Sequence, residues 1–482
     1  MKESFFRGIA SIGLSKHFGM VITFVVTVIL SRVLSPSEFG IVAIAVSFST
    51  LLVIIADLGI SASVIQNKTL DDKDLNTLHT IVFLFGIFLG LTAFLLSNTI
   101  AVFFEEMKLK KILSLFSFYI ALYSLQVVPK AKLSRNRKFI KLGRIFAASQ
   151  LISGIVAIIM AVEGYGLYSI VVKYIADSLV SSLLYTYFSK VKLTTNIRAA
   201  SFLNVFRFSF FQFLFNITAF FSRNFDNFLL GKLLGKFDLG IYDRAYQLMH
   251  MPNMLTTQVF NTVLHPVLSE KQSNNDNIYY EYRKVFFATA LAGLPISAFL
   301  FFSSNEIIPI IYGPQWDNSI VVFKILSISI GFQMLTSTTG PIFQSTNRTD
   351  ILLISGAINT IIIILAIFFG GYFLGKLENV AMALTISFTI NCFITFKLVM
   401  NKLFKRETIK ILSLLKEPII YSLITCLSSI LVESLVNKGY NNILLFTIRL
   451  MVTFTFCFVF LKIHKHSRAK KLILELKNGL LR

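Results

Sequence analysis

The feature that most constrains the fold is a succession of long apolar segments separated by short polar ones. A helix needs roughly 20 residues to cross a bilayer, and about fourteen segments reach that length. The chain has 482 residues, of which 55% are hydrophobic and 15% are charged. A soluble domain could not bury so much apolar surface, so the sequence predicts an all-α, polytopic membrane protein. The expected segments are approximately 9–33, 38–63, 78–104, 111–129, 142–162, 167–189, 204–230, 239–266, 284–304, 318–340, 350–374, 378–400, 417–436 and 441–462.

The distribution of basic residues predicts the orientation of these segments. Lys130, Arg135 and Lys138 follow the fourth segment, and further basic clusters follow the sixth, twelfth and fourteenth. Loops rich in Lys and Arg stay in the cytoplasm, so we expect both termini to be cytoplasmic and the protein to lie in the inner (cytoplasmic) membrane. The net charge of +22 then reflects these loops, and no nucleic-acid partner is expected. The first segment contains Lys16 and His17 and is too long for a signal peptide, so no cleaved signal is expected.

A thirteen-residue motif occurs twice, as Leu30–Val42 and Leu230–Tyr242, at an offset of 200 residues. Each copy would form an outer turn between two membrane helices, with a basic residue at the end of one helix and an acid at the start of the next. Chance similarity between two amphipathic turns is the alternative to a duplication.

A duplication predicts two pseudo-symmetric six-helix lobes around a central cavity, followed by a C-terminal helix pair, because many transporters are built from internal repeats. The expected divisions are an N-terminal lobe at 1–200, a C-terminal lobe at 201–403, the additional helix pair at 404–463 and a basic cytoplasmic tail at 464–482.

Polar residues in the seventh segment recur at spacings that place them on one face of a helix. Ionisable residues inside a membrane are costly and usually functional. Arg223 stands near the centre of this face, and a guanidinium offers the planar, bidentate donors that suit a phosphate. The alternative is that Arg223 and Asp226, at positions i and i+3, neutralise each other, and both interpretations hold if the pair opens on binding. The polar residues of this face are Gln212, Asn216, Arg223, Asp226 and Asn227.

The repeat predicts an equivalent polar face on the first segment. The offset of 200 residues aligns Asn216 with Lys16 and Arg223 with Thr23, and Lys16, Thr23 and Thr27 share a helical face. Both helices are therefore expected to line one central cavity. The expected substrate-binding residues are Lys16, Thr23, Asn216, Arg223, Asp226 and Arg244.

The eighth segment carries Asp243, Arg244 and His250 shortly before Pro252. Proline in a membrane helix frees backbone carbonyls and marks a kink, so this segment is expected to be flexible and to line the cavity. Asp57, near the inner end of the second segment, is either a helix-terminal residue at the interface or a functional carboxylate. The candidates for ion coupling or gating are Asp57, Asp243 and His250.

Nothing in the sequence points to catalysis or to a bound metal. It has no nucleotide-binding loop of the Gly-x-x-x-x-Gly-Lys type, no Ser/His/Asp arrangement, and three cysteines without metal-ligand spacing. The predicted outer loops, such as 163–166 and 437–440, are too short to shape an active site. Lys173 and Asp177, at positions i and i+4, are expected to form a structural pair, and no role is expected for Lys324, Glu433 and Arg449.

Several stretches carry a family resemblance when they are taken in order. They are Leu30–Val42, Asp57–Ser61, Arg223–Asn227, Leu239–Tyr246, Pro266–Ser269 and Gly313–Trp316. Together they resemble polysaccharide flippases of the multidrug/oligosaccharidyl-lipid/polysaccharide exporter superfamily, in the subgroup of colanic-acid, teichuronic-acid and lipopolysaccharide exporters. The resemblance covers nearly the whole chain.

The resemblance implies a transporter rather than an enzyme. Such a protein moves an undecaprenyl-diphosphate-linked oligosaccharide from the inner to the outer leaflet by alternating access, driven by Na⁺ or H⁺ as coupling ion and without another cofactor. It implies cationic cavity residues for the diphosphate or acidic sugars, a role that Lys16 and Arg223 fit. Expected partners are the lipid-linked oligosaccharide, membrane lipids, a polysaccharide polymerase and chain-length proteins.

One departure and three alternatives accompany this interpretation. Acidic residues are few in the N-terminal lobe, so no cation site built from several carboxylates is visible. A cation-coupled multidrug exporter of the same superfamily is disfavoured by Lys16 and Arg223, since such exporters move mostly cationic substrates. A membrane polysaccharide polymerase is disfavoured by the short outer loops and the repeat, and a structural scaffold would not need charges inside the membrane.

Overall fold

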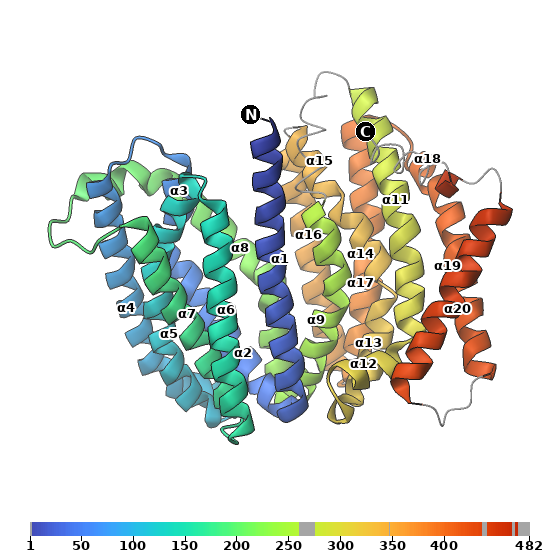
Figure 1. Ribbon diagram of the computed structural model, residues 1–482, viewed down its shortest axis with the longest axis horizontal. Coiled ribbons are helices and arrows are strands. Elements are labelled where there is room, and N and C mark those ends of the chain that lie inside the picture. The colour runs from blue at the N-terminus through green and yellow to red at the C-terminus, as the bar shows by residue number, and fades with distance from the viewer. Residues whose placement is uncertain (1, 260–274, 347, 436–440, 465–467, 471–482) are drawn as a thin grey trace. The chain divides into compact units, whose positions relative to one another are not determined.

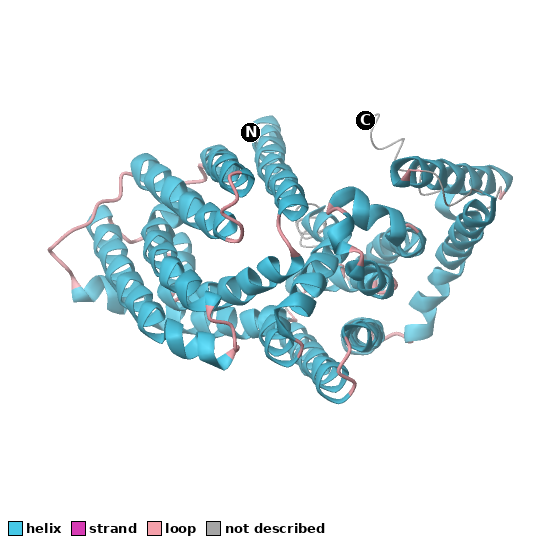
Figure 2. Ribbon diagram, turned by 90° about the horizontal axis from the view of Figure 1, so that it is seen from below, coloured by secondary structure: helices cyan, strands magenta, loops and turns pink. Residues whose placement is uncertain are grey.

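The computed structural model describes residues 2–259, 275–346, 348–435, 441–464 and 468–470 (Figure 1). Every element within these ranges is a helix, and Figure 2 shows the same ranges without a strand. The predicted all-α class is therefore confirmed. The side chains of residues 2–17 lie outside the described part of the chain.

The chain forms two compact units, residues 1–240 and 241–482. The helices of the first unit run as long, mostly antiparallel rods joined by short turns (Figure 1). They are α1 (Lys2–Val33), α2 (Pro36–Asp57), α3 (Ile60–Gln66), α4 (Asp72–Phe103), α5 (Lys108–Arg135), α6 (Phe139–Val162), α7 (Tyr168–Ser189), α8 (Ala199–Leu233) and the start of α9 (Gly235–Val259).

The second unit contains the rest of α9 and a larger number of short helices. They are α11 (Asn275–Phe302), α12 (Ser304–Ile311), η2 (Pro314–Trp316), α13 (Asn318–Ser327), α14 (Ile330–Ser337), α15 (Thr339–Ser345), α16 (Thr349–Phe368), η3 (Phe369–Phe373), α17 (Leu377–Leu398), η4 (Val399–Phe404), α18 (Thr408–Leu412), η5 (Ser413–Leu415), α19 (Lys416–Leu435) and α20 (Asn442–Ile463).

Within the described residues the expected apolar segments fall on helices, with 38–63 divided between α2 and α3 and 318–340 among α13, α14 and α15. Residues 260–266 and 436 lie outside the described ranges. By length and composition, 9 helices of the described residues could each cross a membrane, or up to 11 if two bent pairs are counted as single spans. The membrane-protein class is confirmed, whereas the expected number of about fourteen spans stays a prediction. Among the segments that miss the criterion is α9, which carries Asp238, Asp243 and Arg244.

The seventh predicted segment, α8, packs against α2, α3 and α4 within the first unit. The boundary between the compact units therefore lies after Gly240 and not at the expected lobe boundary of 200–201. The lobes were inferred from sequence repetition, which marks common origin and not packing, so the four expected divisions remain predictions.

The two copies of the repeated motif pack against each other through their glycines. A Cβ added to Gly40 would lie 1.8 Å from the carbonyl oxygen of Lys236, and one added to Gly240 would lie 1.9 Å from the carbonyl oxygen of Pro36. Gly40 corresponds to Gly240 and Pro36 to Lys236 at the offset of 200. Equivalent residues of the two copies therefore make equivalent contacts, as in a two-fold interface. The repeat is thus a physical pseudo-symmetry inside the first unit.

The acid of the first copy opens α2 as predicted. Ser35 N and Glu38 Oε2 are 2.9 Å apart, and Ser35 Oγ lies 3.4 Å from Glu38 N, which together make a capping box. The other carboxylate oxygen of Glu38 accepts a bond from Leu167 N at 3.0 Å. This side chain therefore joins the α1–α2 turn to the α6–α7 turn at the same end of the unit.

The basic residues of the second copy join that same end to the α4–α5 turn. Lys232 Nζ lies 2.8 Å from Glu105 Oε1, and Lys236 pairs with Glu106. The hydrogen bond from Lys232 lowers the pKa of the Glu105 carboxyl. A carboxyl with a lowered pKa stabilises the folded protein through its ion pair at neutral pH. This stabilisation is lost as the pH falls through the lowered pKa.

Candidate functional site

The polar face predicted on α8 is only partly solvent-facing. Gln212 Nε2 donates to Asn216 Oδ1 at 3.0 Å, so these two amides bind each other along the helix. Near the other end, Asn227 Nδ2 donates to Ser47 Oγ of α2 at 3.1 Å, and Asp226 is buried. α8 therefore contacts α2 near the end that holds Asp226, and the role of this polar face in substrate binding stays a prediction.

Arg223 differs from its neighbours on this face because its side chain is exposed. The helix bends by 44° between Phe221 and Arg223. Within the described residues Arg223 forms no ion pair, while Asp226 Oδ1 accepts a bond from Asn227 N at 2.9 Å. An ion pair between Arg223 and Asp226 is therefore not formed in this conformation, and the role of the guanidinium stays a prediction.

Thr23 of α1 points to α6 within the first unit. Its Oγ1 lies 3.0 Å from Gln150 Oε1 and 2.9 Å from the carbonyl oxygen of Gly19. The side chain of Lys16 lies outside the described part of the chain, so its predicted partnership with Thr23 and Arg223 stays a prediction.

Asp57 is the last residue of α2 and lines a cavity of about 240 Å³ formed with α3 and α5. Ser61 donates to it twice, from its backbone N at 3.1 Å and from its hydroxyl at 2.8 Å. Tyr123 and Lys130 line the same cavity. Asp57 therefore lies at the end of a helix, as one of the two interpretations expected, and its role in ion coupling stays a prediction.

The cavity exists because α2 and α3 are broken at Leu58 and Gly59, which have φ values of +50° and +74°. A Cβ at Gly59 would lie 2.3 Å from the carbonyl oxygen of Ser209 in α8. Glycine is required here both for the left-handed backbone and for the close approach of α8. The break turns the chain so that Ser61 reaches back to Asp57.

The charged residues predicted on the eighth segment form a local group in the second unit. Arg244 is 6% exposed, and its Nε donates to Asp243 Oδ2 at 3.1 Å. Gln247 Nε2 donates to Asp243 Oδ1 at 3.2 Å, and the ring of His250 packs edge-on against Tyr246 with the centroids 4.8 Å apart. Arg244 thus already has an anionic partner, whereas Arg223 has none among the described residues.

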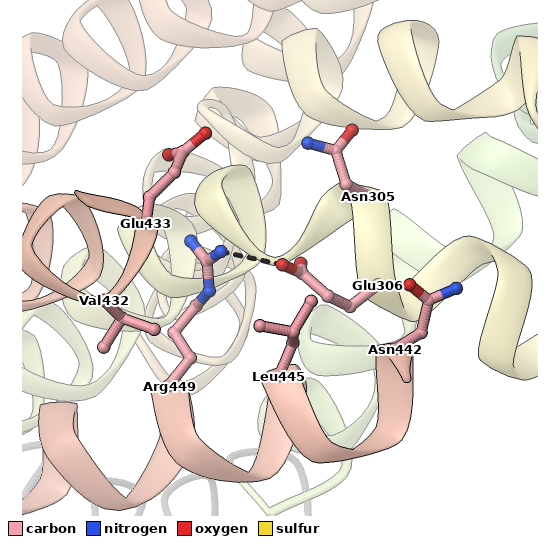
Figure 3. Close-up of a pocket in the computed structure, with 7 residues that line it drawn as sticks. All are labelled: Asn305, Glu306, Val432, Glu433, Asn442, Leu445 and Arg449. Atoms are coloured by element: carbon pink, nitrogen blue, oxygen red, sulfur yellow. Dashed lines mark hydrogen bonds and ion pairs between the residues drawn. The ribbon is translucent and has the colours of Figure 1, made fainter. Parts of the chain in front are cut away.

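One charged pair was missed by sequence reasoning. Glu306 of α12 and Arg449 of α20 form an ion pair of 2.7 Å, and both side chains are buried (Figure 3). No periodicity links two residues 143 positions apart. The available signal was the cost of placing Arg449 inside an apolar segment, which by itself makes an ionisable residue a functional candidate.

The described residues contain no cluster of three or more His, Cys, Asp or Glu side chains that could hold a metal ion. The polar groups of the site are instead single cations, amides and carboxylates.

The sequence matches a known family and several curated relatives. The family model described as "Polysaccharide biosynthesis protein" matches residues 29–321. The lipopolysaccharide biosynthesis protein WzxC of Escherichia coli (strain K12) is 23% identical over 72% of this chain and 71% of its own length. The succinoglycan biosynthesis transport protein ExoT of Rhizobium meliloti (strain 1021) is 24% identical over 70% of this chain and 69% of its own length.

Solved transporters share the fold. The lipid II flippase MurJ, in an inward closed conformation, aligns with a TM-score of 0.70 at 18% identity, covering 94% of this chain and 98% of its own. A multidrug resistance MATE family transporter in an inward-facing conformation aligns with a TM-score of 0.59 at 15% identity, covering 82% of this chain and 95% of its own. The family model covers more than half of the sequence, so the chain belongs to the polysaccharide biosynthesis protein family, and its resemblance to the polysaccharide flippases is confirmed.

Proposed function

We propose that this protein moves a lipid-linked oligosaccharide from the inner to the outer leaflet of the cytoplasmic membrane for the synthesis of a cell-surface polysaccharide. The lipid carrier in this proposal is undecaprenyl diphosphate. The observation that carries it is the exposed Arg223 on a membrane helix, without an ion pair among the described residues. A guanidinium binds phosphate oxygens through planar paired donors, and an unpaired cation is costly in a membrane unless it has such a use.

The same observation separates the flippase from a multidrug exporter. A cationic drug would be repelled by Arg223, whereas the diphosphate of a lipid carrier would be attracted. The family match and the names of the curated relatives support the same choice.

A vesicle assay tests this function. The purified protein is placed in liposomes with a fluorescent undecaprenyl-diphosphate-linked oligosaccharide, and the fraction accessible to an impermeant quencher is followed. We expect redistribution between leaflets that depends on the protein, and we expect no gradient-driven efflux of ethidium from the same vesicles. Ethidium efflux without lipid redistribution would overturn the flippase in favour of the drug exporter.

The coupling ion belongs to the same proposal. Transport is by alternating access, and an inward gradient of Na⁺ or H⁺ drives it. Asp57 is supported as a candidate because it lines a cavity beside Lys130, and Asp243 and His250 remain candidates in the second unit. Imposing each gradient separately on the vesicles identifies the ion as the one that accelerates redistribution.

The orientation, with both termini cytoplasmic, is tested by thiol labelling. Lys138 and Glu163 flank opposite ends of α6, which places them about 38 Å apart at 1.5 Å per residue. In a variant lacking Cys392, Cys426 and Cys457, we expect Glu163→Cys but not Lys138→Cys to react with an impermeant maleimide added outside. Labelling of Lys138→Cys alone would invert the topology.

A further inference from the structure

The ion pair between Glu306 and Arg449 stands at the floor of a cavity in the second unit (Figure 3). Arg449 Nη2 donates to Glu306 Oε1 at 2.7 Å. The two residues are only 3% and 4% exposed. Burying a charge is unfavourable unless it is paired and hydrogen-bonded, so the remaining polar atoms of this pair decide what it can bind.

Three of those atoms have no partner in the described part of the chain. They are Nε and Nη1 of Arg449 and Oε2 of Glu306. Buried polar atoms are nearly always hydrogen-bonded, and an exception calls for an explanation. Here two free donors and one free acceptor lie next to a cavity that both side chains line.

The cavity has a volume of about 280 Å³ and a polar rim. Asn305, Glu433 and Asn442 form the rim and are exposed, whereas Val432 is buried beside them. Figure 3 shows these side chains reaching the cavity from α12, α19 and α20. The volume is just below the range of about 300–1,000 Å³ for sites of drug-sized ligands, so it suits a ligand of one ring.

The charges of the cavity exclude some ligands. Two carboxylates, Glu306 and Glu433, face one guanidinium, so the lining is negative overall and repels an anion. A hydroxyl group can accept a hydrogen bond from a guanidinium N–H and donate one to a carboxylate oxygen. An amide can also donate and accept hydrogen bonds. A ring with several hydroxyl groups therefore satisfies the free atoms of Arg449 and Glu306 together.

We propose that the cavity between α12, α19 and α20 binds one neutral sugar ring through its hydroxyl groups. The choice of a sugar rests on the proposed function, because a flippase for a lipid-linked oligosaccharide meets sugar rings in its substrate. Asn442 follows the loop 437–440, which the sequence predicts to be outside, so the site would hold part of the glycan as it leaves the protein.

The test uses the full-length protein in lipid nanodiscs and saturation-transfer difference NMR with free sugars. The probes are D-glucose, D-galactose and N-acetyl-D-glucosamine, with D-glucuronate as the anionic comparison. We expect transfer to the ring protons of at least one neutral sugar. Loss of a hydrogen bond from a charged group should reduce this signal about tenfold in Arg449→Gln and in Glu306→Gln.

Because those two variants also break the ion pair, a third variant keeps the test decisive. Asn442→Leu leaves the pair intact and removes a rim amide, and we expect it to reduce the signal as well. The matched control is Asn401→Leu, an exposed asparagine in η4, which should leave the signal unchanged. Thermal unfolding of each variant shows whether it is folded.

Three results of the binding experiment would overturn the sugar site. No transfer to any neutral sugar in the unsubstituted protein refutes it, and so does a stronger signal from glucuronate. A signal that survives in Asn442→Leu, while Arg449→Gln only loses stability, makes the pair a structural anchor of α20. Sugar binding does not require transport, so lipid redistribution without sugar binding rejects this site alone, and sugar binding without redistribution rejects the proposed function alone.

Discussion

Replacing Gly40 by alanine is expected to destabilise the protein severely, although alanine is the better helix former. In an open helical position the change would stabilise the helix by about 1 kcal/mol. At Gly40 the new Cβ would lie 1.8 Å from the carbonyl oxygen of Lys236, and backbone cannot move aside as a side chain can. Overpacking of this kind costs about 1–3 kcal/mol or more, so we expect a lower unfolding temperature and less protein in the membrane.

The pseudo-symmetry supplies a second variant and the chain supplies a control. Gly240→Ala should have a similar effect, because its Cβ would meet the carbonyl oxygen of Pro36 at 1.9 Å. Gly356→Ala in α16 meets nothing within 4 Å and should be neutral or slightly stabilising. The measurement is thermal unfolding of the three purified variants in detergent, and a Gly40→Ala protein as stable as Gly356→Ala would contradict the contact between the motif copies.

The helices themselves could be predicted because a membrane leaves few choices. Every backbone polar group must be satisfied within the segment, so a long apolar run becomes a helix whatever its neighbours are. The limits of the helices were harder to predict. The expected segment 38–63 is divided into α2 and α3, since Gly59 is needed where Ser209, far away in sequence, comes close.

In the candidate site, too, the sequence predicted what depends on neighbouring residues and not what depends on contacts between distant ones. Helical spacing placed Arg223 and Asp226 on one face of α8, but spacing cannot tell that Asp226 is buried whereas Arg223 is exposed. The ion pair between Glu306 and Arg449 joins α12 to α20, and no local sequence pattern predicts a contact between residues so far apart in the chain. The repeat relates distant residues at an offset of 200, and this offset maps the contact of Gly40 with Lys236 onto that of Gly240 with Pro36, but the sequence did not predict that the two copies touch.

Arg223→Ala is expected to reduce export of the polysaccharide strongly while the protein remains folded in the membrane. The side chain is exposed and has no ion pair among the described residues, so its removal should leave the packing of α8 intact. Hydrogen bonds to charged groups are worth about 1.5–3 kcal/mol each, and losing one such bond to a diphosphate lowers transport on the order of 10- to 100-fold. The measurement is the rate of leaflet redistribution in vesicles together with the amount of protein incorporated.

Two further variants identify what Arg223 contributes. Arg223→Lys keeps the charge but loses the planar paired donors, so we expect it to transport at an intermediate rate. Arg207→Ala removes another exposed arginine from α8 and should transport normally, because Arg207 lies in the predicted cytoplasmic part of the helix. If Arg223→Ala transported as well as Arg207→Ala, the guanidinium would have no part in substrate binding. If it failed to reach the membrane while Arg223→Lys did, the positive charge would serve the insertion of α8 instead.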